Sequence, residues 1–233
     1  MTLRFVRLPN WSLKQLNSEM NIGEPDTHRR ASWYKRLFAY MMAQSSAEYN
    51  GIVGDRKRAL LGGLRGSVLE IGAGTAPNLG YYSRDIDWLG IEPNPAMFPY
   101  ARRQAQELGI NIALREGQSE RLPVPDASID AVVSTLVLCS VRDQVISLQE
   151  VLRVLKPGGQ FVFIEHVAAE RGTGLRRLQG VVRPLWQLCS DGCQPNRETW
   201  TTIENAGFSH VQLEHFHVDA PIVSPHIAGT AVK

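Results

Sequence analysis

Short apolar runs alternate with longer amphipathic segments from Ser67 to the end of the chain. The apolar runs predict strands at 68–71, 87–92, 111–115, 129–134, 160–166, 208–216 and 226–232. The segments between them predict helices at 77–82, 95–108, 143–155, 197–206 and 175–189, the last interrupted at Pro184. Strands that alternate with helices are typical of parallel βαβ units, and the final two strands suit a hairpin at the sheet edge. We therefore predict an α/β, Rossmann-like fold with a seven-stranded, mostly parallel sheet whose last strand is antiparallel.

The N-terminal part of the chain has a different pattern. Residues 1–29 are mixed and polar, whereas aromatic and apolar residues recur with helical spacing over 31–50. We predict that 1–50 forms an extension and a helical cap, with Tyr34 facing a substrate pocket. Residues 51–233 then form the main domain, with a helical insertion near 170–200. Because basic residues accompany the aromatic ones, peripheral contact with a membrane is a further possibility for the cap.

Composition narrows the class of protein. The 233 residues contain 25 Lys and Arg against 23 Asp and Glu, so we expect no nucleic-acid partner and a small-molecule substrate instead. The three cysteines are too few for a disulfide framework, and this count suits a reducing compartment such as the cytoplasm. Since no run of about 18 apolar residues occurs, we expect no transmembrane segment.

The first predicted strand ends in a glycine turn that suits a ligand. Glycine lets a backbone approach a ligand closely, and an acid at the end of the next strand, 18 residues after Gly74, can accept hydrogen bonds from ribose hydroxyls. Together these features predict a cofactor that contains adenosine. The cofactor contacts assigned here are Glu70, Gly72, Ala73, Gly74, Glu92 and Pro93.

The details of the turn favour S-adenosylmethionine over a dinucleotide. A dinucleotide fingerprint requires a third glycine, and Pro77 stands in its place. An acid at position 70, before the first glycine, is also more typical of S-adenosylmethionine sites. Two later segments complete the predicted site: Gln118 and Ser119 follow the third strand, where they can reach the adenine. Thr135 and Leu136 continue the fourth strand at the carboxyl edge, where open sheets bind ligands.

Beyond these motifs, the chain resembles the class I S-adenosylmethionine-dependent methyltransferases of the type-11 group. More narrowly, it is similar to the methyltransferase-like thiol S-methyltransferases of animals. The narrow resemblance is carried by the segments 135–141, 165–170, 191–193, 197–200 and 225–227. It implies a class I methyltransferase fold and methyl transfer to a thiol. The animal enzymes differ in carrying an apolar N-terminal anchor and, usually, Asp at the position of Glu92.

Methyl transfer from a sulfonium is an in-line displacement, so alignment of the nucleophile supplies much of the acceleration. A base beside the acceptor would raise the fraction of thiolate. His166, at the end of the fifth strand, is the first candidate, and Asp191 could orient it or bind the acceptor. Cys139, Cys193 and His226, together with Tyr34, are the candidate pocket residues. The alternative for each of these side chains is a structural role in packing or in a turn.

Three functions compete at this stage. The leading one is transfer of a methyl group to a small, apolar acceptor, with a thiol preferred. The second is N- or O-methylation of a phospholipid or small molecule, and the third is a non-catalytic cofactor-binding protein that docks a partner. We predict no metal site, because His215 and His217 lack the further acids or cysteines that a metal pair would need.

Overall fold

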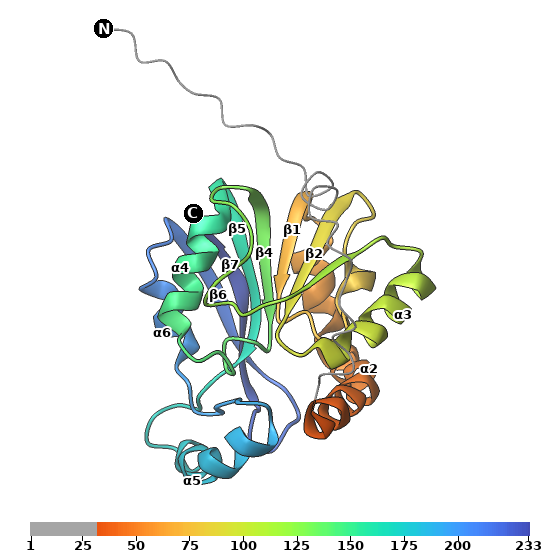
Figure 1. Ribbon diagram of the computed structural model, residues 1–233. Helices are drawn as coiled ribbons and strands as arrows, with labels where there is room; N and C mark the ends of the chain where they lie inside the picture. The colour runs from red at the N-terminus through yellow and green to blue at the C-terminus, as the bar shows by residue number, and fades with distance from the viewer. Residues whose placement is uncertain (1–31) are drawn as a thin grey trace, which may run out of the picture.

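The computed structural model describes residues 32–233, apart from the side chains of 46–48. The predictions for residues 1–29 lie outside this range. Within this range, a central sheet lies between helices. A further helix, α5 (Gly174–Cys189), lies beyond the ends of the strands (Figure 1). This arrangement confirms the α/β, Rossmann-like class.

The sheet has seven strands in the order β3-β2-β1-β4-β5-β7-β6. β7 runs antiparallel to both of its neighbours, β5 and β6, while the pairs from β3 to β5 are parallel. The predicted mixed sheet with an antiparallel last strand is therefore confirmed. The strands are β1 (Gly66–Ile71), β2 (Ile86–Glu92), β3 (Ala113–Glu116), β4 (Ile129–Thr135), β5 (Leu155–His166), β6 (His210–His217) and β7 (Pro225–Val232).

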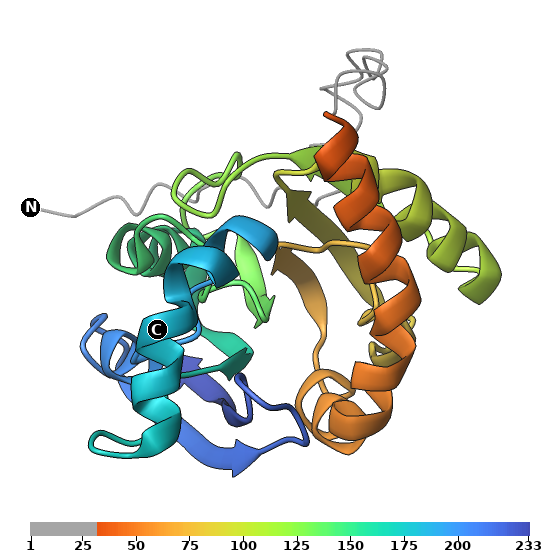
Figure 2. The same cartoon turned by 90° about the horizontal axis from the view of Figure 1, so that it is seen from below.

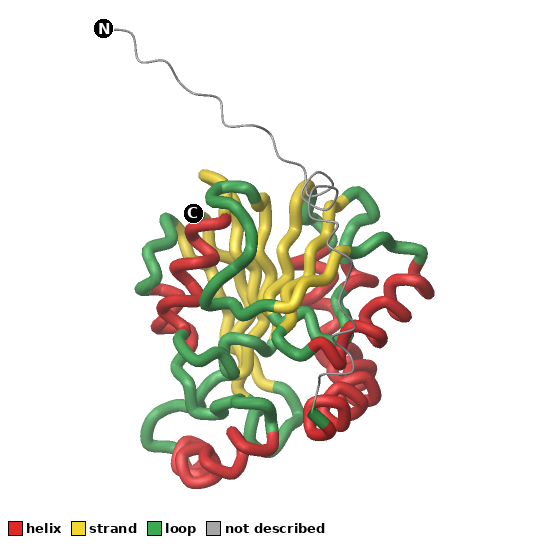
Figure 3. Tube along the Cα trace, viewed as in Figure 1, coloured by secondary structure: helices red, strands yellow, loops and turns green. Residues whose placement is uncertain are grey.

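Both faces of the sheet are buried over the central strands β1, β2 and β4, as their near-continuous apolar sequences require. Alternate residues of β1 enter different core clusters, with Val68 on one face and Leu69 on the other. The face of Leu69 packs against α4 (Gln144–Val154) and α6 (Thr199–Glu204). The face of Val68 packs against η2 (Leu79–Tyr81), α3 (Phe98–Leu108) and the end of α2 (Trp33–Leu61), with η3 (Pro95–Met97) preceding α3. Figure 3 shows the strands enclosed by helices on these two sides.

The helical cap is longer than expected. α2 extends over Trp33–Leu61, and so it crosses the division that we place at residue 50. Gly51 and the charged residues that follow it disfavour a continuous amphipathic helix in the sequence. In the structure, however, Val53, Lys57 and Leu61 recur every four residues and are all buried. Tertiary packing of this stripe thus outweighs the weak local propensity.

The prediction that Pro184 interrupts its helix is wrong. α5 (Gly174–Cys189) is one helix with Pro184 inside it. Proline removes the hydrogen bond to the carbonyl of the residue four positions earlier, which is Gly180. Both Pro184 and Gly180 are exposed, so water can solvate that carbonyl and the helix continues.

Two glycines provide a matched test of the fold. A Cβ at Gly229 in β7 would lie 2.1 Å from the carbonyl oxygen of Gln212 and 2.8 Å from the Cα of Leu213, whereas Gly51 in α2 has open space at that position. We expect Gly229→Ala to lower the free energy of unfolding by about 2 kcal/mol or more. Gly51→Ala should instead raise it by about 0.5–1 kcal/mol. Urea denaturation of both variants measures these changes, and equal stability would contradict the packing described for β7.

Candidate functional site

The predicted site residues gather at one edge of the sheet. Because β1, β2, β4 and β5 are parallel neighbours, their carboxyl ends meet there. Viewed from below, α2 and α5 lie on opposite sides of this edge (Figure 2). Open α/β sheets bind their ligands outside this edge.

The glycine turn after β1 is fixed by contacts with two other strands. Gly72 and Gly74 have φ values of +59° and +54°, which favour glycine. A Cβ on Gly72 would lie 2.4 Å from a methyl group of Val137, just beyond β4, so a larger residue would not fit. The amide of Ala73 donates to the carbonyl of Ile91 in β2, at 3.1 Å. The turn therefore lies against the ends of both β2 and β4.

Glu92, at the end of β2, is the acid that faces this turn. Its Oε2 accepts a hydrogen bond from the Gly74 amide at 2.9 Å, and its Oε1 accepts one from the Asn94 amide at 2.8 Å. Burial raises the pKa of Glu92 to about 7; the backbone amides of Asn94 and Gly74 partly offset the shift, Asp191 adds to it and Lys35 opposes it. Each carboxylate oxygen has two lone pairs. Glu92 can therefore accept further hydrogen bonds from a ligand, while Pro93 beside it is exposed.

Glu70 points instead into the protein. Its carboxylate accepts hydrogen bonds from Asn78 Nδ2 at 2.8 Å, the Tyr82 hydroxyl at 2.7 Å and Trp88 Nε1 at 3.0 Å. Burial raises the pKa of Glu70. These bonds join β1 to the segment after the glycine turn and to β2. The structure thus gives Glu70 a supporting position beneath the turn.

Asn78 is a residue that the sequence analysis missed. Its Nδ2 donates to Glu70 and to Thr135 Oγ1, at 2.8 and 3.0 Å, so it connects the turn to the end of β4. Its Oδ1 is buried and has no hydrogen-bond partner within residues 32–233. A buried amide oxygen without a partner is costly. It therefore provides an acceptor for a ligand donor, such as an ammonium group, beside the turn.

The remaining predicted cofactor residues border the same region. Gly117, before Gln118, donates its amide to the Glu92 carbonyl at 3.4 Å, so the loop after β3 lies beside the acid. Gln118 is exposed, whereas the Ser119 hydroxyl is buried against Ser147. At the end of β4, Leu136 has a φ of +57°, a conformation that non-glycine residues adopt rarely and that is concentrated at functional sites.

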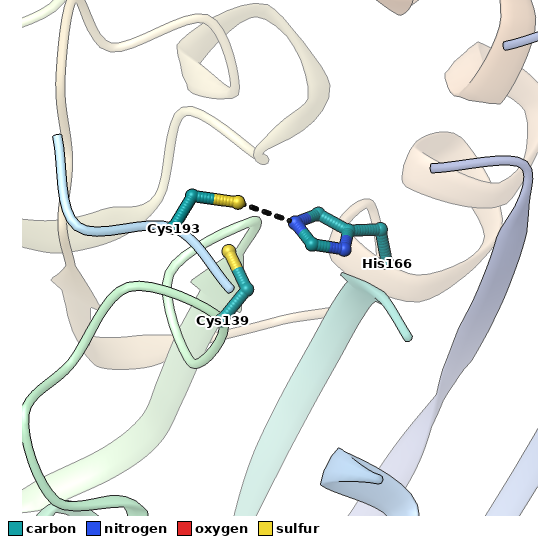
Figure 4. A group of neighbouring side chains, drawn as sticks. All are labelled: Cys139, His166 and Cys193. Carbon is teal, nitrogen blue, oxygen red and sulfur yellow. Dashed lines mark hydrogen bonds between the residues drawn. The ribbon is translucent and has the colours of Figure 1, made fainter. Parts of the chain in front are cut away.

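Cys139, His166 and Cys193 form a buried cluster beyond the ends of β4 and β5 (Figure 4). His166 Nε2 lies 3.0 Å from Cys193 Sγ, and Trp186 Nε1 donates to the same sulfur at 3.2 Å. A hydrogen bond from the Cys139 thiol, together with these two contacts, lowers the pKa of Cys193. The pKa of Cys139 is raised, because its thiol donates its proton to Cys193 in that bond. His166 Nδ1 is buried and lacks a hydrogen-bond partner among the described residues.

His226 lies next to this cluster. It pairs with His166 across β5 and β7, and the two ring centroids are 6.2 Å apart. Burial lowers its pKa to about 4, so the ring is neutral, and its Nδ1 contacts the Ser224 carbonyl at 3.1 Å. The ring of Tyr49 in α2 is tilted by 32° against that of His226, with the centroids 5.9 Å apart, and the Tyr49 hydroxyl is buried without a partner in the described part of the chain. Tyr49 is a second residue that the sequence analysis missed.

The first turn of α2 contacts the end of α5, the loop after it, and the segment after Glu92. Lys35 Nζ forms an ion pair with Asp191 at 2.8 Å, and the Tyr34 hydroxyl donates to the Leu188 carbonyl at 3.1 Å. Asn94, next to Glu92, donates its Nδ2 to the Lys35 carbonyl at 3.0 Å. The carboxylate of Asp191 is thus paired with Lys35, and among the described residues it has no hydrogen bond to His166. The sequence gives no sign of this pairing, because the partners are 156 residues apart.

Comparison with known proteins places this geometry in a family. The methyltransferase domain model matches residues 69–163, which span the glycine turn, Glu92 and most of β5. The human thiol S-methyltransferase TMT1A is 39% identical over 221 residues, covering 87% of this chain and 88% of the human protein. A phosphatidylethanolamine N-methyltransferase of Cereibacter sphaeroides is 32% identical over 109 residues, covering 46% of this chain and 54% of that protein.

Solved structures agree on the fold. A SAM-dependent methyltransferase of Thermotoga maritima, titled a possible histamine N-methyltransferase, superposes with a TM-score of 0.58 at 19% identity, covering 84% of this chain and 99% of that chain. The glycine turn, the acid of Glu92 and the unpartnered oxygen of Asn78 fit S-adenosylmethionine as the cofactor. The chain thus belongs to the family of S-adenosylmethionine-dependent class I methyltransferases that includes the human thiol S-methyltransferases.

Proposed function

We propose that this methyltransferase transfers the methyl group of S-adenosylmethionine to the sulfur of a small, apolar thiol. The observation that carries the proposal is the 39% identity to a thiol S-methyltransferase over most of both chains. The buried cluster of Cys139, His166 and Cys193 beside the predicted methyl site supports it, because a polarisable, hydrogen-bonding pocket suits a thiol.

Glu92, Asn78 and the glycine turn would hold the cofactor. The Glu92 carboxylate would accept hydrogen bonds from the ribose hydroxyls, and Asn78 Oδ1 would accept one from the ammonium group of the methionine moiety. Gln118 and the Ser119 backbone would border the adenine, and Thr135 and Leu136 would line the methionine side. When bound, the cofactor supplies an electrophilic methyl group on a sulfonium.

On the acceptor side, His166 would raise the reactivity of the thiol. A thiol with an ordinary pKa near 8.5 is only about 3% ionised at pH 7. For a thiol of that pKa, a group that favours the thiolate can therefore accelerate transfer at pH 7 by at most about 30-fold through ionisation alone. His166 Nδ1 is buried and has no partner within the described chain, so it is available to the acceptor proton. Tyr34, Cys139, Cys193 and His226 would shape the pocket around it.

The direct test is a panel of thiols, amines, phenols and phosphatidylethanolamine incubated with the enzyme and labelled S-adenosylmethionine. Label on thiols alone supports the proposal. Label on amines, phenols or the phospholipid would favour N- or O-methylation, an alternative that the similarity to phosphatidylethanolamine N-methyltransferase supports. Binding of S-adenosylhomocysteine without turnover of any acceptor would favour a non-catalytic binding protein.

We also propose that the enzyme acts in the cytoplasm, at a membrane surface. All three cysteines are free, which suits a reducing compartment.

No helix in the described residues has the length and apolar character needed to cross a bilayer. However, Val181, Leu185 and Leu188 form an exposed apolar face on α5, a helix that contains arginines and no acidic residue. Such a helix suits the interface of an anionic membrane.

Replacing Val181 and Leu185 together by Glu should abolish this contact. The wild-type protein is expected to sediment with anionic phospholipid vesicles and the double variant to remain in the supernatant, because two charges replace exposed apolar side chains that make no core contacts. Equal sedimentation of the two proteins would contradict peripheral membrane contact through α5.

Cofactor affinity should depend on pH through Glu92. A carboxylate accepts hydrogen bonds from ribose better than a carboxylic acid does, and the pKa of Glu92 is about 7, set by burial and modulated by Asp191 and Lys35. We therefore expect the affinity for S-adenosylhomocysteine to rise about tenfold between pH 6 and pH 8. In calorimetry, Glu92→Gln should weaken binding by about 1–3 kcal/mol at pH 8 and remove the pH dependence. A wild-type slope that persists in the variant would place the titrating group elsewhere.

His166→Ala should slow turnover without weakening cofactor binding. We expect kcat with an alkyl thiol to fall by about 10- to 30-fold at pH 7, and the defect to shrink with an aryl thiol, which ionises more readily. The exposed His210 provides the matched control, since His210→Ala should leave kcat unchanged. If the defect of His166→Ala is the same for both thiols, or appears only as a lower Tm, His166 has a structural role.

A further inference from the structure

We propose that Cys139, His166 and Cys193 bind one Zn²⁺ ion, and that the fourth position of the ion receives the sulfur of the acceptor thiol. The three potential ligand atoms all lie within 4.8 Å of one another and are buried. In Figure 4, both sulfur atoms and the imidazole ring point toward a common centre. The identity of the fourth ligand rests on the proposed thiol methylation, whereas the metal site itself stands on this geometry.

No two of the ligand atoms are more than 4.8 Å apart, so shifts of about 1 Å or less bring them to the spacing of a tetrahedral ion. With metal–sulfur bonds near 2.3 Å and metal–nitrogen bonds near 2.0–2.1 Å, ligand atoms around Zn²⁺ are roughly 3.5–3.8 Å apart. The spacing between Cys193 Sγ and His166 Nε2 is 3.0 Å, so these two atoms would separate by about 0.5 Å to admit the ion. A rotation of the cysteine side chain is enough for such a change, because Cys193 lies in a loop and not in a helix or strand.

Charge balance favours Zn²⁺ at this buried position. Two thiolates and one neutral imidazole around a divalent cation give a site with no net charge, which avoids the cost of burying an isolated ion. Thiolate and imidazole are also the ligands that select Zn²⁺ over Mg²⁺ or Ca²⁺. Three protein ligands leave one coordination position open, as in catalytic zinc sites with two cysteines and one histidine.

Hydrogen bonds around the cluster hold the potential ligands in place, as those around metal ligands do. Trp186 Nε1 donates to Cys193 Sγ at 3.2 Å, which is the type of outer hydrogen bond that holds a thiolate ligand. The amide of Gln194, next to Cys193, donates to the carbonyl of Cys139 at 3.0 Å. This backbone bond keeps the loops after α5 and after β4 together. The three ligands thus come from separate segments that are already joined.

The ion would activate the thiol in a balanced reaction. The acceptor R–SH replaces a water molecule on Zn²⁺ and loses its proton to solvent, so that it binds as a thiolate. Its sulfur lone pair forms the new bond to the methyl carbon of S-adenosylmethionine. The bond from that carbon to the sulfonium sulfur breaks, and its electron pair stays on the sulfur of S-adenosylhomocysteine. The product R–S–CH₃ is a neutral, weaker ligand, and water displaces it.

Metal content and a cobalt spectrum test the site directly. Full-length protein is purified without a metal-binding tag under reducing conditions, and its zinc is measured by mass spectrometry after dialysis. We expect roughly one Zn²⁺ per chain, reduced at least tenfold in Cys139→Ser and Cys193→Ser. Cys189→Ser is the matched control, since Cys189 is exposed and lies outside the cluster. Zinc below about 0.1 per chain in the wild type after zinc titration, or equal zinc in all variants, would overturn the proposal.

Cobalt gives a reading that needs no variant and so does not depend on whether the serine variants fold. Wild-type protein loaded with Co²⁺ should show the intense visible bands of tetrahedral thiolate coordination and sulfur-to-cobalt charge transfer. Adding an apolar alkyl thiol should shift these bands, whereas its methyl thioether should not. Spectra typical of six-coordinate aqueous Co²⁺ would refute a cysteine–histidine site.

Activity measurements separate this inference from the proposed function. If the zinc-free protein methylates thiols at the full rate in the presence of a chelator, binding of the acceptor sulfur to the ion is refuted and thiol methylation stands, with His166 acting as the base. If zinc binds but the acceptor panel shows no label on thiols, the metal site stands and the proposed function fails.

Discussion

The glycine turn after β1 is the constraint on which the rest of the site depends. Its backbone is held by Ile91 in β2, by Glu92 at the end of that strand, and by close packing of Gly72 against Val137 beyond β4. Three strand ends therefore converge on one short turn. Because the strands are parallel, a ligand that binds this turn lies beside the acid of β2 and the end of β4, on the side of the sheet where the cluster of Cys139, His166 and Cys193 lies.

The proposed acceptor side of the site includes residues from segments outside the sheet. Cys193 comes from the loop after α5, and Tyr49 comes from α2. The ion pair between Lys35 and Asp191 connects these two elements on the cofactor side. The same fold carries many chemistries, so in our proposal this added region, together with His166 and His226 at the strand ends, selects the acceptor.

Much of the fold could be predicted from local patterns. The strands follow from short apolar runs, and Glu92 follows from its place at the end of a run after a glycine turn. The structure departs from these patterns where tertiary packing outweighs local propensity. α2 continues past Gly51 because its far end buries Val53 and Leu61, and α5 continues through Pro184 because that residue and Gly180 are exposed, where water can solvate the freed carbonyl.

The side-chain partnerships of the site were harder to predict. The cluster consists of Cys139, His166 and Cys193, which are widely separated in the sequence. Their spacing matches no regular pattern of cysteines and histidines that would predict a cluster. Asn78 and Tyr49 are ordinary polar residues until burial leaves Asn78 Oδ1 and the Tyr49 hydroxyl without partners in the described chain. Such side chains can be recognised only in the folded structure, because residues far apart in the sequence determine their burial and their contacts.

The central claim is that S-adenosylmethionine binds across the ends of β1 and β2 with its reactive end toward Cys139, His166 and Cys193. A crystal structure of the complex with S-adenosylhomocysteine tests this most directly. We expect both ribose hydroxyls within hydrogen-bond distance of the Glu92 carboxylate and the ligand sulfur facing the cluster of Cys139, His166 and Cys193. A ligand whose ribose lies away from Glu92, or whose sulfur points away from that cluster, would contradict the account.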